Sequence, residues 1–239
     1  MRMPFARPAV LGLAAALALA GAARAAENAT FSFSLAGIPV GSMSLASKLD
    51  GDRYDATARL DTTALVNVFA EFFFDGQATG TLRSDGKVVP GRYKATSKSM
   101  RALRHTDIAW KNGVPVSVSV DPPRSSAPDP AEQGGALDPV SAGFRLFREA
   151  PPDAVCDTTI FVFDGSRRSR LVLDPPVRNG RQLTCAGKFA RVEGEAASMA
   201  DLREFPFSIA FRVNDQGIAQ LTRIEAPTNF GKAVVARND

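Results

Sequence analysis

The chain has only one histidine, His105, and two cysteines, Cys156 and Cys185, among its 239 residues. A single imidazole leaves one candidate for the general base of a nucleophilic triad. Two cysteines and one histidine are also a poor ligand set for zinc. His105 lies in the middle of a predicted strand, where a surface histidine is the simpler interpretation. The sequence therefore predicts no catalytic residue and no metal or cofactor site.

The short motifs that mark common enzyme classes are missing as well. The chain contains no G-x-S-x-G elbow, no H-E-x-x-H pair, no phosphate-cradling loop and no dinucleotide fingerprint. Asp50 with Asp52, and Glu193 with Glu195, are spaced as same-face pairs on strands. We interpret them as solvated strand faces rather than as glycosidase carboxylates. The chain is not expected to be an enzyme, and a divergent hydrolase is kept only as a third hypothesis.

Long apolar runs are absent except near the N-terminus. Arg2 and Arg7 precede the run Ala9–Ala20, and Ala23–Ala25 offers a small-x-small cleavage site. Residues 1–25 are therefore predicted to be a secretory signal peptide. The run is shorter than the about 20 apolar residues that span a bilayer. The alternative is an uncleaved N-terminal anchor. A lipoprotein-type anchor is not expected, because neither cysteine lies near the cleavage site.

A clustered excess of basic charge is also absent from the mature chain. The whole chain has 29 basic and 25 acidic residues, and the leader carries Arg2, Arg7 and Arg24 with no acid. Without the leader, 26 basic residues face 25 acidic ones, and the two signs are interleaved. Nucleic-acid binders carry a basic face, so no nucleic-acid partner is expected. We interpret the densest basic group, Arg167, Arg168 and Arg170, as flanking a hairpin turn rather than as binding phosphate.

The two cysteines are predicted to form a disulfide. Export places them in an oxidising compartment, and only one intramolecular pairing of Cys156 and Cys185 exists. Closing a loop of this length stabilises a fold by about 3–4 kcal/mol in the chain-entropy model. The alternative is a redox pair, but catalytic pairs usually lie close together, as C-x-x-C.

Period-two alternation of apolar and polar residues dominates the rest of the chain and predicts strands. The alternating runs cover residues 31–35, 42–45, 54–60, 114–120 and 208–213. Turn dipeptides occur between strand-like stretches, at Asp50-Gly51, Asp85-Gly86, Asn112-Gly113, Asp164-Gly165, Asn179-Gly180 and Gln216-Gly217. The pattern predicts an all-β protein, built as a curled antiparallel sheet or half-barrel. Residues 26–239 are expected to form a single β-rich domain, with two smaller domains as the alternative.

Two segments break this alternation and predict short helices. Helical spacing covers about residues 63–70, and Asp138-Pro139 begins a second helix at 138–149 with a capping residue followed by proline. The preceding segment, 121–136, is rich in proline and glycine. It is interpreted as a connector to that helix, with a mobile flap over a cavity as the alternative. The chain also has 16 phenylalanines against two tyrosines and one tryptophan, which suits either a plain core or a pocket for an acyl chain.

Several landmarks resemble a known family. They are Pro39-Val40-Gly41, Val66-Asn67-Val68-Phe69 followed by Gly76 and Gly80, Leu137-Asp138-Pro139-Val140-Ser141, Val162 to Arg168, Cys185-Ala186-Gly187 and Val192-Glu193-Gly194. Together they resemble the exported bacterial proteins called domain of unknown function 3108, over most of residues 30–236. The resemblance implies a Gram-negative periplasm and a relation to β-spiral and half-barrel proteins, among them envelope-homeostasis factors and lipoprotein carriers. It transfers no catalytic residue.

These observations lead to three functional hypotheses. The first is a non-catalytic periplasmic protein that supports cell-envelope integrity and holds an apolar ligand or a lipidated segment in the concave sheet. The second is a protein-interaction module that docks an envelope partner through an edge or flank of the sheet. The third is the divergent hydrolase, for which His105 is the residue to test. Fold alone does not decide among them.

Overall fold

The structure is a computed structural model that describes residues 25–63, 72–99, 102–124, 126–194 and 204–238. One antiparallel sheet of 14 strands contains all the strands described. Along its main path the order is β7-β6-β5-β4-β3-β2-β1-β14-β13-β12-β11-β9-β8, and β10 pairs with β11 beside this path. The prediction of an all-β curled antiparallel sheet is confirmed.

The strands form an up-and-down meander in which most neighbours in sequence pair. The exceptions are β7 with β8 and β9 with β10, while β1 pairs with β14 and β9 with β11. Their bounds are β1 Ala25–Leu35, β2 Ile38–Asp50, β3 Arg53–Thr62, β4 Phe73–Leu82, β5 Val88–Ser99, β6 Ala102–Lys111, β7 Val114–Asp121, β8 Thr158–Phe163, β9 Arg167–Leu173, β10 Val177–Asn179, β11 Gln182–Gly194, β12 Phe205–Val213, β13 Ala219–Thr228 and β14 Gly231–Arg237. All six turn glycines predicted from the sequence have positive φ, as tight hairpins require.

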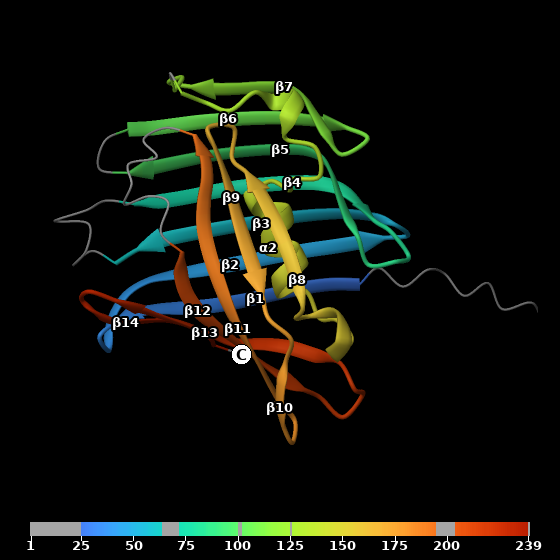
Figure 1. Cartoon of the computed structure of the whole chain (residues 1–239), viewed down its shortest axis with the longest axis vertical. Coiled ribbons are helices and arrows are strands. Elements are labelled where there is room, and N and C mark those ends of the chain that lie inside the picture. Colours follow the sequence, from blue (N-terminus) through green and yellow to red (C-terminus); the bar gives the residue numbers. More distant parts are fainter. Residues whose placement is uncertain (1–24, 64–71, 100–101, 125, 195–203, 239) are drawn as a thin grey trace, which may run out of the picture.

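The curled sheet folds over itself into two layers. In Figure 1, β1 to β7 lie across the back, while β8, β9, β11 and β12 cross in front of them, with α2 between the layers. The ladder runs without a break from one layer to the other, because β1 pairs with β14 from Phe31 opposite Arg237 to Leu35 opposite Ala233. The concave side of the sheet therefore faces itself across a single helix.

The helix α2 spans Pro139–Phe147, inside the range 138–149 predicted from the sequence. Asp138 caps it, and proline occupies its first turn. Two further short turns are 3-10 helices, η1 Pro130–Glu132 and η2 Pro152–Ala154. The other predicted helix, at about 63–70, lies from residue 64 onward outside the described residues.

The end of the proline- and glycine-rich segment connects the two edges of the sheet. The Gly135 N–H donates to Gly113 O, in the turn between β6 and β7, at 2.9 Å. Leu137 then pairs with the edge strand β8: its N–H donates to Phe161 O, and its carbonyl accepts from the Phe163 N–H, each at 2.8 Å. Ala136 and Asp138 are fully buried. This part of the segment is built into the interior, and it covers backbone groups that an edge strand otherwise leaves open.

Two hydrophobic clusters fill the space between the layers. One surrounds the N-terminal part of α2 and includes Tyr54, Ile108, Val140, Phe144 and Phe163. The other lies beside the C-terminal end of α2 and includes Phe31, Leu173, Cys185, Phe211 and Leu221. Leu45, Leu146 and Leu171 pack against both clusters. The concave face of the sheet is thus occupied along α2 by the protein's own side chains.

The turn between β8 and β9 packs against the opposite layer, and a glycine substitution tests this contact. A Cβ at Gly165 would lie 2.8 Å from Val120 Cγ2, whereas a Cβ at Gly180 meets nothing within 4 Å. Both glycines have positive φ, +88° and +58°. Gly180→Ala is expected to lower the free energy of unfolding by about 1 kcal/mol through backbone strain alone. Gly165→Ala adds a collision and should cost about 2–3 kcal/mol, measured by denaturant titration. Equal costs would contradict the packing of this turn.

Candidate functional site

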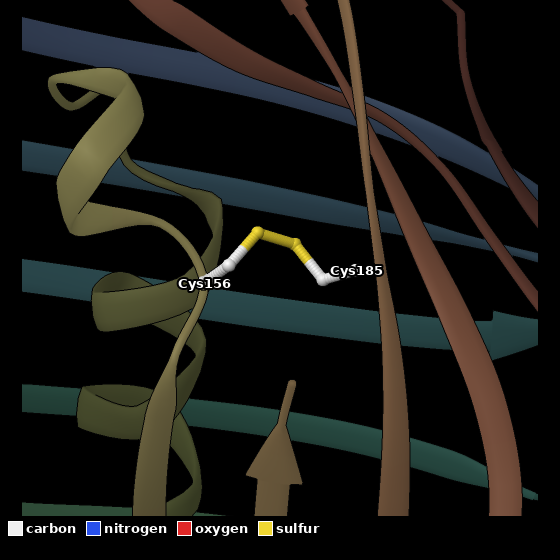
Figure 2. The surroundings of a disulfide bond; sticks show 2 residues. All are labelled: Cys156 and Cys185. Atoms are coloured by element: carbon white, nitrogen blue, oxygen red, sulfur yellow. A yellow bond between two sulfur atoms is a disulfide. The ribbon is translucent and has the colours of Figure 1, made fainter. Parts of the chain in front are cut away.

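The predicted disulfide is present. Cys156 follows η2 and Cys185 lies on β11, with their Cα atoms 6.0 Å apart. Figure 2 shows the bond extending from the chain beside α2 to the strand that passes in front of the back layer. Cys185 is fully buried and Cys156 nearly so. The bond therefore fastens the segment after α2 to the second core cluster, and no free cysteine remains.

The one histidine lies on an exposed part of β6. His105 Nδ1 is 3.1 Å from Thr96 Oγ1 on the neighbouring strand. Both line a depression of about 680 Å³ over β4 to β7, together with Asp107 and Asp121. Among the residues that the structure describes, no group of three or more histidine, cysteine or acidic side chains is placed to hold a metal ion. The part of the chain described also has no helix long and apolar enough to cross a membrane.

The arginines and acidic pairs singled out in the sequence are separated by the fold. Arg168 donates to Gln133 Oε1 at 3.0 Å and lies over the Phe161 ring, with its Cζ 4.4 Å from the centroid. Arg170 pairs with Glu204 at 3.0 Å. Asp50 and Asp52 are exposed at the β2–β3 turn, while Glu195 lies outside the described residues. None of these residues shares a site with His105 in the described contacts.

The start of α2 is held to the back layer by a buried polar group. Asp138 Oδ1 accepts from the Ser141 N–H at 2.8 Å, and its Oδ2 accepts from the Ser141 hydroxyl. The Ser141 Oγ is also 2.6 Å from the Tyr54 hydroxyl on β3. Burial raises the pKa of Asp138 to about 6, although the hydrogen bonds from Ser141 act in the opposite direction and lower it. The same desolvation raises the pKa of Tyr54.

The end of α2 is held by aromatic contacts and by a polar group shared with both halves of the sheet. Phe144 stacks on Tyr54 with ring centroids 4.5 Å apart, and Phe147 meets Phe31 edge-on at 5.0 Å. The Glu149 N–H donates to Glu27 Oε2 on β1 at 3.2 Å. The Glu149 carboxylate accepts from Gln220 on β13 at 2.9 Å. Residues that follow α2 therefore join β1 to β13.

A cavity of about 230 Å³ lies at this end of α2, between the helix and strands β1 and β2. Its apolar walls come from five residues that also belong to, or pack against, the two core clusters: Ala29, Leu45, Ala56, Phe144 and Phe147. The polar residues around it are Glu27, Asn28, Ser47, Arg148, Glu149 and Arg237. The arrangement combines an apolar interior with charged groups of both signs.

The charged groups of this cavity are partly withdrawn from water. Burial raises the pKa of Glu27, and the neighbouring Glu149 raises it further, while the Glu149 N–H and Arg148 lower it. Burial lowers the pKa of Arg148, and Glu27 raises it. The Nε–H of Arg148 is shielded from solvent and has no acceptor among the described residues. A buried donor without a partner is costly, so a ligand that supplied an oxygen acceptor would relieve this cost.

Sequence reasoning did not find this cavity. Glu27 and Arg148 are 121 positions apart, and neither belongs to a recognisable motif. The phenylalanine-rich composition was the only signal, since it indicated either a core or an apolar pocket. Both are present: Phe31, Phe163 and Phe211 are fully buried core residues, while Phe144 and Phe147 line the cavity.

Comparison with known proteins places the chain in a family. The family model described as "Protein of unknown function (DUF3108)" matches residues 30–235. The chain therefore belongs to this family, as the sequence landmarks indicated. Neither a curated protein nor a solved structure matches the chain.

Proposed function

We propose that this member of the DUF3108 family is a non-catalytic protein of the cell envelope that binds the end of an acyl chain, or a similarly small apolar group with an oxygen acceptor. The binding site is the cavity at the end of α2. The observation that carries the proposal is an apolar cavity beside a shielded arginine donor that lacks an acceptor among the described residues. The predicted leader and the buried disulfide support a place outside the cytoplasm.

The size of the cavity limits its occupant. At about 230 Å³ it is larger than the ~150 Å³ apolar cavity that accepts benzene. It is smaller than the ~300–1,000 Å³ pockets of drug-sized ligands. A complete lipid does not fit, but a short acyl group does. Its chain would contact Leu45 and Phe147, and its carboxylate or ester oxygen would accept from Arg148. The role in envelope integrity would then be to hold one acyl end of a lipid or lipidated segment.

Filling the cavity is expected to abolish binding. Ser47 is half-buried on β2 and lines the cavity, so Ser47→Leu places three additional carbon atoms there. We expect the Kd for octanoate, measured by calorimetry, to rise at least about tenfold, or about 1.4 kcal/mol. Stability should stay the same or increase, because a void is filled. Ser44→Leu is the matched control, since Ser44 lies on the same strand but is exposed. Unchanged affinity in Ser47→Leu would refute this site.

Removing the shielded donor tests how the ligand is held. Arg148→Met keeps much of the side-chain length but removes the Nε–H donor. A hydrogen bond to a charged group contributes about 1.5–3 kcal/mol, so the Kd for octanoate should rise roughly ten- to hundredfold. Arg59→Met is the control, because Arg59 is exposed on β3 and pairs only with Asp61 in the described contacts. Equal affinities of the two variants would mean that Arg148 does not hold the ligand.

A second candidate function is docking to an envelope protein, and it rests on a different observation. Phe230 is 80% exposed in the β13–β14 turn, and Ile38 is 56% exposed beside the β1–β2 turn. The two turns are adjacent, since the Ala36 N–H donates to Lys232 O at 2.9 Å. Exposed apolar groups gathered in this way mark interaction sites. A stoichiometric protein partner recovered with the wild type, lost with Phe230→Ser and free of lipid, would favour this function over ligand binding.

A further inference from the structure

Arginines occupy the inner face of the sheet at one end of the space between the layers. On β9, Leu173 is 1% exposed and faces the interior. Because side chains on a strand alternate between faces, Arg167, six positions earlier, faces the same way. On β11, Cys185 is fully buried, and Arg191 is again six positions away. Arg191 also lies beside this face of β9, since it pairs directly with Ser169.

The opposite layer contributes to the same region. On β6, Ile108 is fully buried, so Arg104, four positions earlier, also faces the interior. The β8–β9 turn lies against this strand, because a Cβ at Gly165 would be 3.3 Å from Thr106 Cγ2. Arg104 Nε donates to Pro122 O at 3.2 Å, two positions before Arg124 in the chain. All four arginines are half-buried rather than exposed.

Three of these arginines act electrostatically on the fourth, Arg124. Burial lowers the pKa of Arg124, and Arg167, Arg104 and Arg191 lower it further, while Asp164 raises it. Asp164 is already engaged in its own turn, where its Oδ1 accepts from the Ser166 and Arg167 N–H groups, each at 2.8 Å. The Nε–H of Arg167 is shielded from solvent without an acceptor among the described residues. Half-buried cations gathered in this way favour an anionic ligand.

We propose that Arg104, Arg124, Arg167 and Arg191, the inner arginine cluster, bind a phosphate-type oxyanion between the two layers of the sheet. Guanidinium groups suit this ligand because their planar donors match phosphate oxygens in pairs. Arg168 and Arg170 do not belong to the cluster, because they are one and three positions from Arg167 on β9 and so point to the other face of the sheet. The site is separate from the cavity at the end of α2, and its residues do not line that cavity. The phosphate group can belong to a soluble compound or to a lipid headgroup.

The first experiment measures binding of inorganic pyrophosphate to the full mature chain by calorimetry. We expect saturable binding that weakens as salt is raised, as phosphate contacts do. Arg167→Gln and Arg104→Gln should each raise the Kd at least about tenfold, because each removes a charged donor. Arg170→Gln is the matched control on the same strand, and it should leave the Kd unchanged. The unfolding transition of every variant checks that the variant is folded. Removing one of several like charges should leave the midpoint of this transition unchanged or raise it.

The second experiment distinguishes the two sources of the phosphate group. Flotation is measured with vesicles of phosphatidylglycerol and phosphatidylcholine, and with vesicles of phosphatidylcholine alone. Flotation with the anionic vesicles that is lost in Arg167→Gln identifies a lipid headgroup, while pyrophosphate binding without flotation identifies a soluble phosphate. The proposal is overturned if the wild type binds neither pyrophosphate nor anionic vesicles, or if Arg167→Gln and Arg104→Gln bind as well as Arg170→Gln. None of these outcomes depends on octanoate, so the acyl site is tested separately.

Discussion

Replacing both cysteines with alanine is expected to lower the free energy of unfolding by about 3–4 kcal/mol, through loss of the constraint on the unfolded chain. The loop that the bond closes contains β8, β9, β10 and the start of β11, with a sequence separation of 29. These elements form one edge of the sheet, and the closing strand β8 pairs in the ladder only with β9. The bond therefore fastens an edge of the sheet at which β8 has a neighbouring strand on one side only.

The measurement is denaturant-induced unfolding of the wild type and the Cys156→Ala/Cys185→Ala variant, with and without a reducing agent. Because both sulfur-bearing residues are buried, reduction of the folded wild type should be slow and should become rapid once the chain unfolds. After reduction, the wild type should approach the stability of the variant, and the variant itself should not respond to the reducing agent. A variant as stable as the oxidised wild type would contradict a structural role for the bond.

Replacing Asp138 with alanine is expected to cost about 3–4 kcal/mol. The substitution removes the N-terminal cap of α2, which contributes about 0.5–2 kcal/mol. Besides the Ser141 N–H that the cap satisfies, it also leaves the buried Ser141 hydroxyl without its carboxylate acceptor, which costs about 1–3 kcal/mol. Asp138→Asn should cost far less at neutral pH, because its amide oxygen can still accept from that N–H and its amide nitrogen can donate to the Ser141 hydroxyl. Denaturant titration of the two variants at neutral pH measures the difference.

The same position is expected to make stability depend on pH. Burial raises the pKa of Asp138 from 3.8 to about 6, so the folded state holds this proton more tightly than the unfolded state. The stabilisation that this proton contributes is complete below the pKa of Asp138 in the unfolded state. It is lost as the pH rises through the pKa of Asp138 in the folded state. The wild type should therefore lose stability relative to Asp138→Asn between pH about 4 and about 6, with a constant difference above that range.

Comparison of the two proteins cancels the other titrating groups, which both share. The difference in unfolding free energy, Asp138→Asn minus wild type, should grow by about 3 kcal/mol at most across this window. A difference that does not change with pH would show that Asp138 has the same pKa in the folded and unfolded states. Tyr54→Phe is a useful companion, since it removes the hydroxyl next to Ser141 but keeps the ring stacked on Phe144.

The local features of this protein were predictable because each depends on neighbouring residues. From Tyr54 to Leu60 apolar and polar residues alternate because one face of the strand is buried. In β3 these residues do alternate between the buried and the exposed face. The positive φ of Gly51 or Gly113 follows from the turn dipeptide. The start of α2 follows from Asp138 and Pro139, whose cap and proline act within one turn. The disulfide followed from there being only two cysteines.

The features that suggest function were decided by the tertiary structure. Nothing near Leu137 in the sequence indicates that it pairs with the edge strand β8. The raised pKa of Asp138 depends on burial between the layers, and the same residue at an exposed helix start would remain an ordinary acid. Glu27 and Arg148 meet because β1 passes the end of α2. The inner arginine cluster exists because the sheet folds over itself and brings β6 against the β8–β9 turn.

The sequence by itself determined the strands, the turns, the capped helix, the cysteine pair and the family. Only the tertiary structure decided which residues from distant strands share a buried space. The physical reason is range: alternation, turn geometry and capping act over a few residues, whereas desolvation and the gathering of like charges depend on which layers lie face to face.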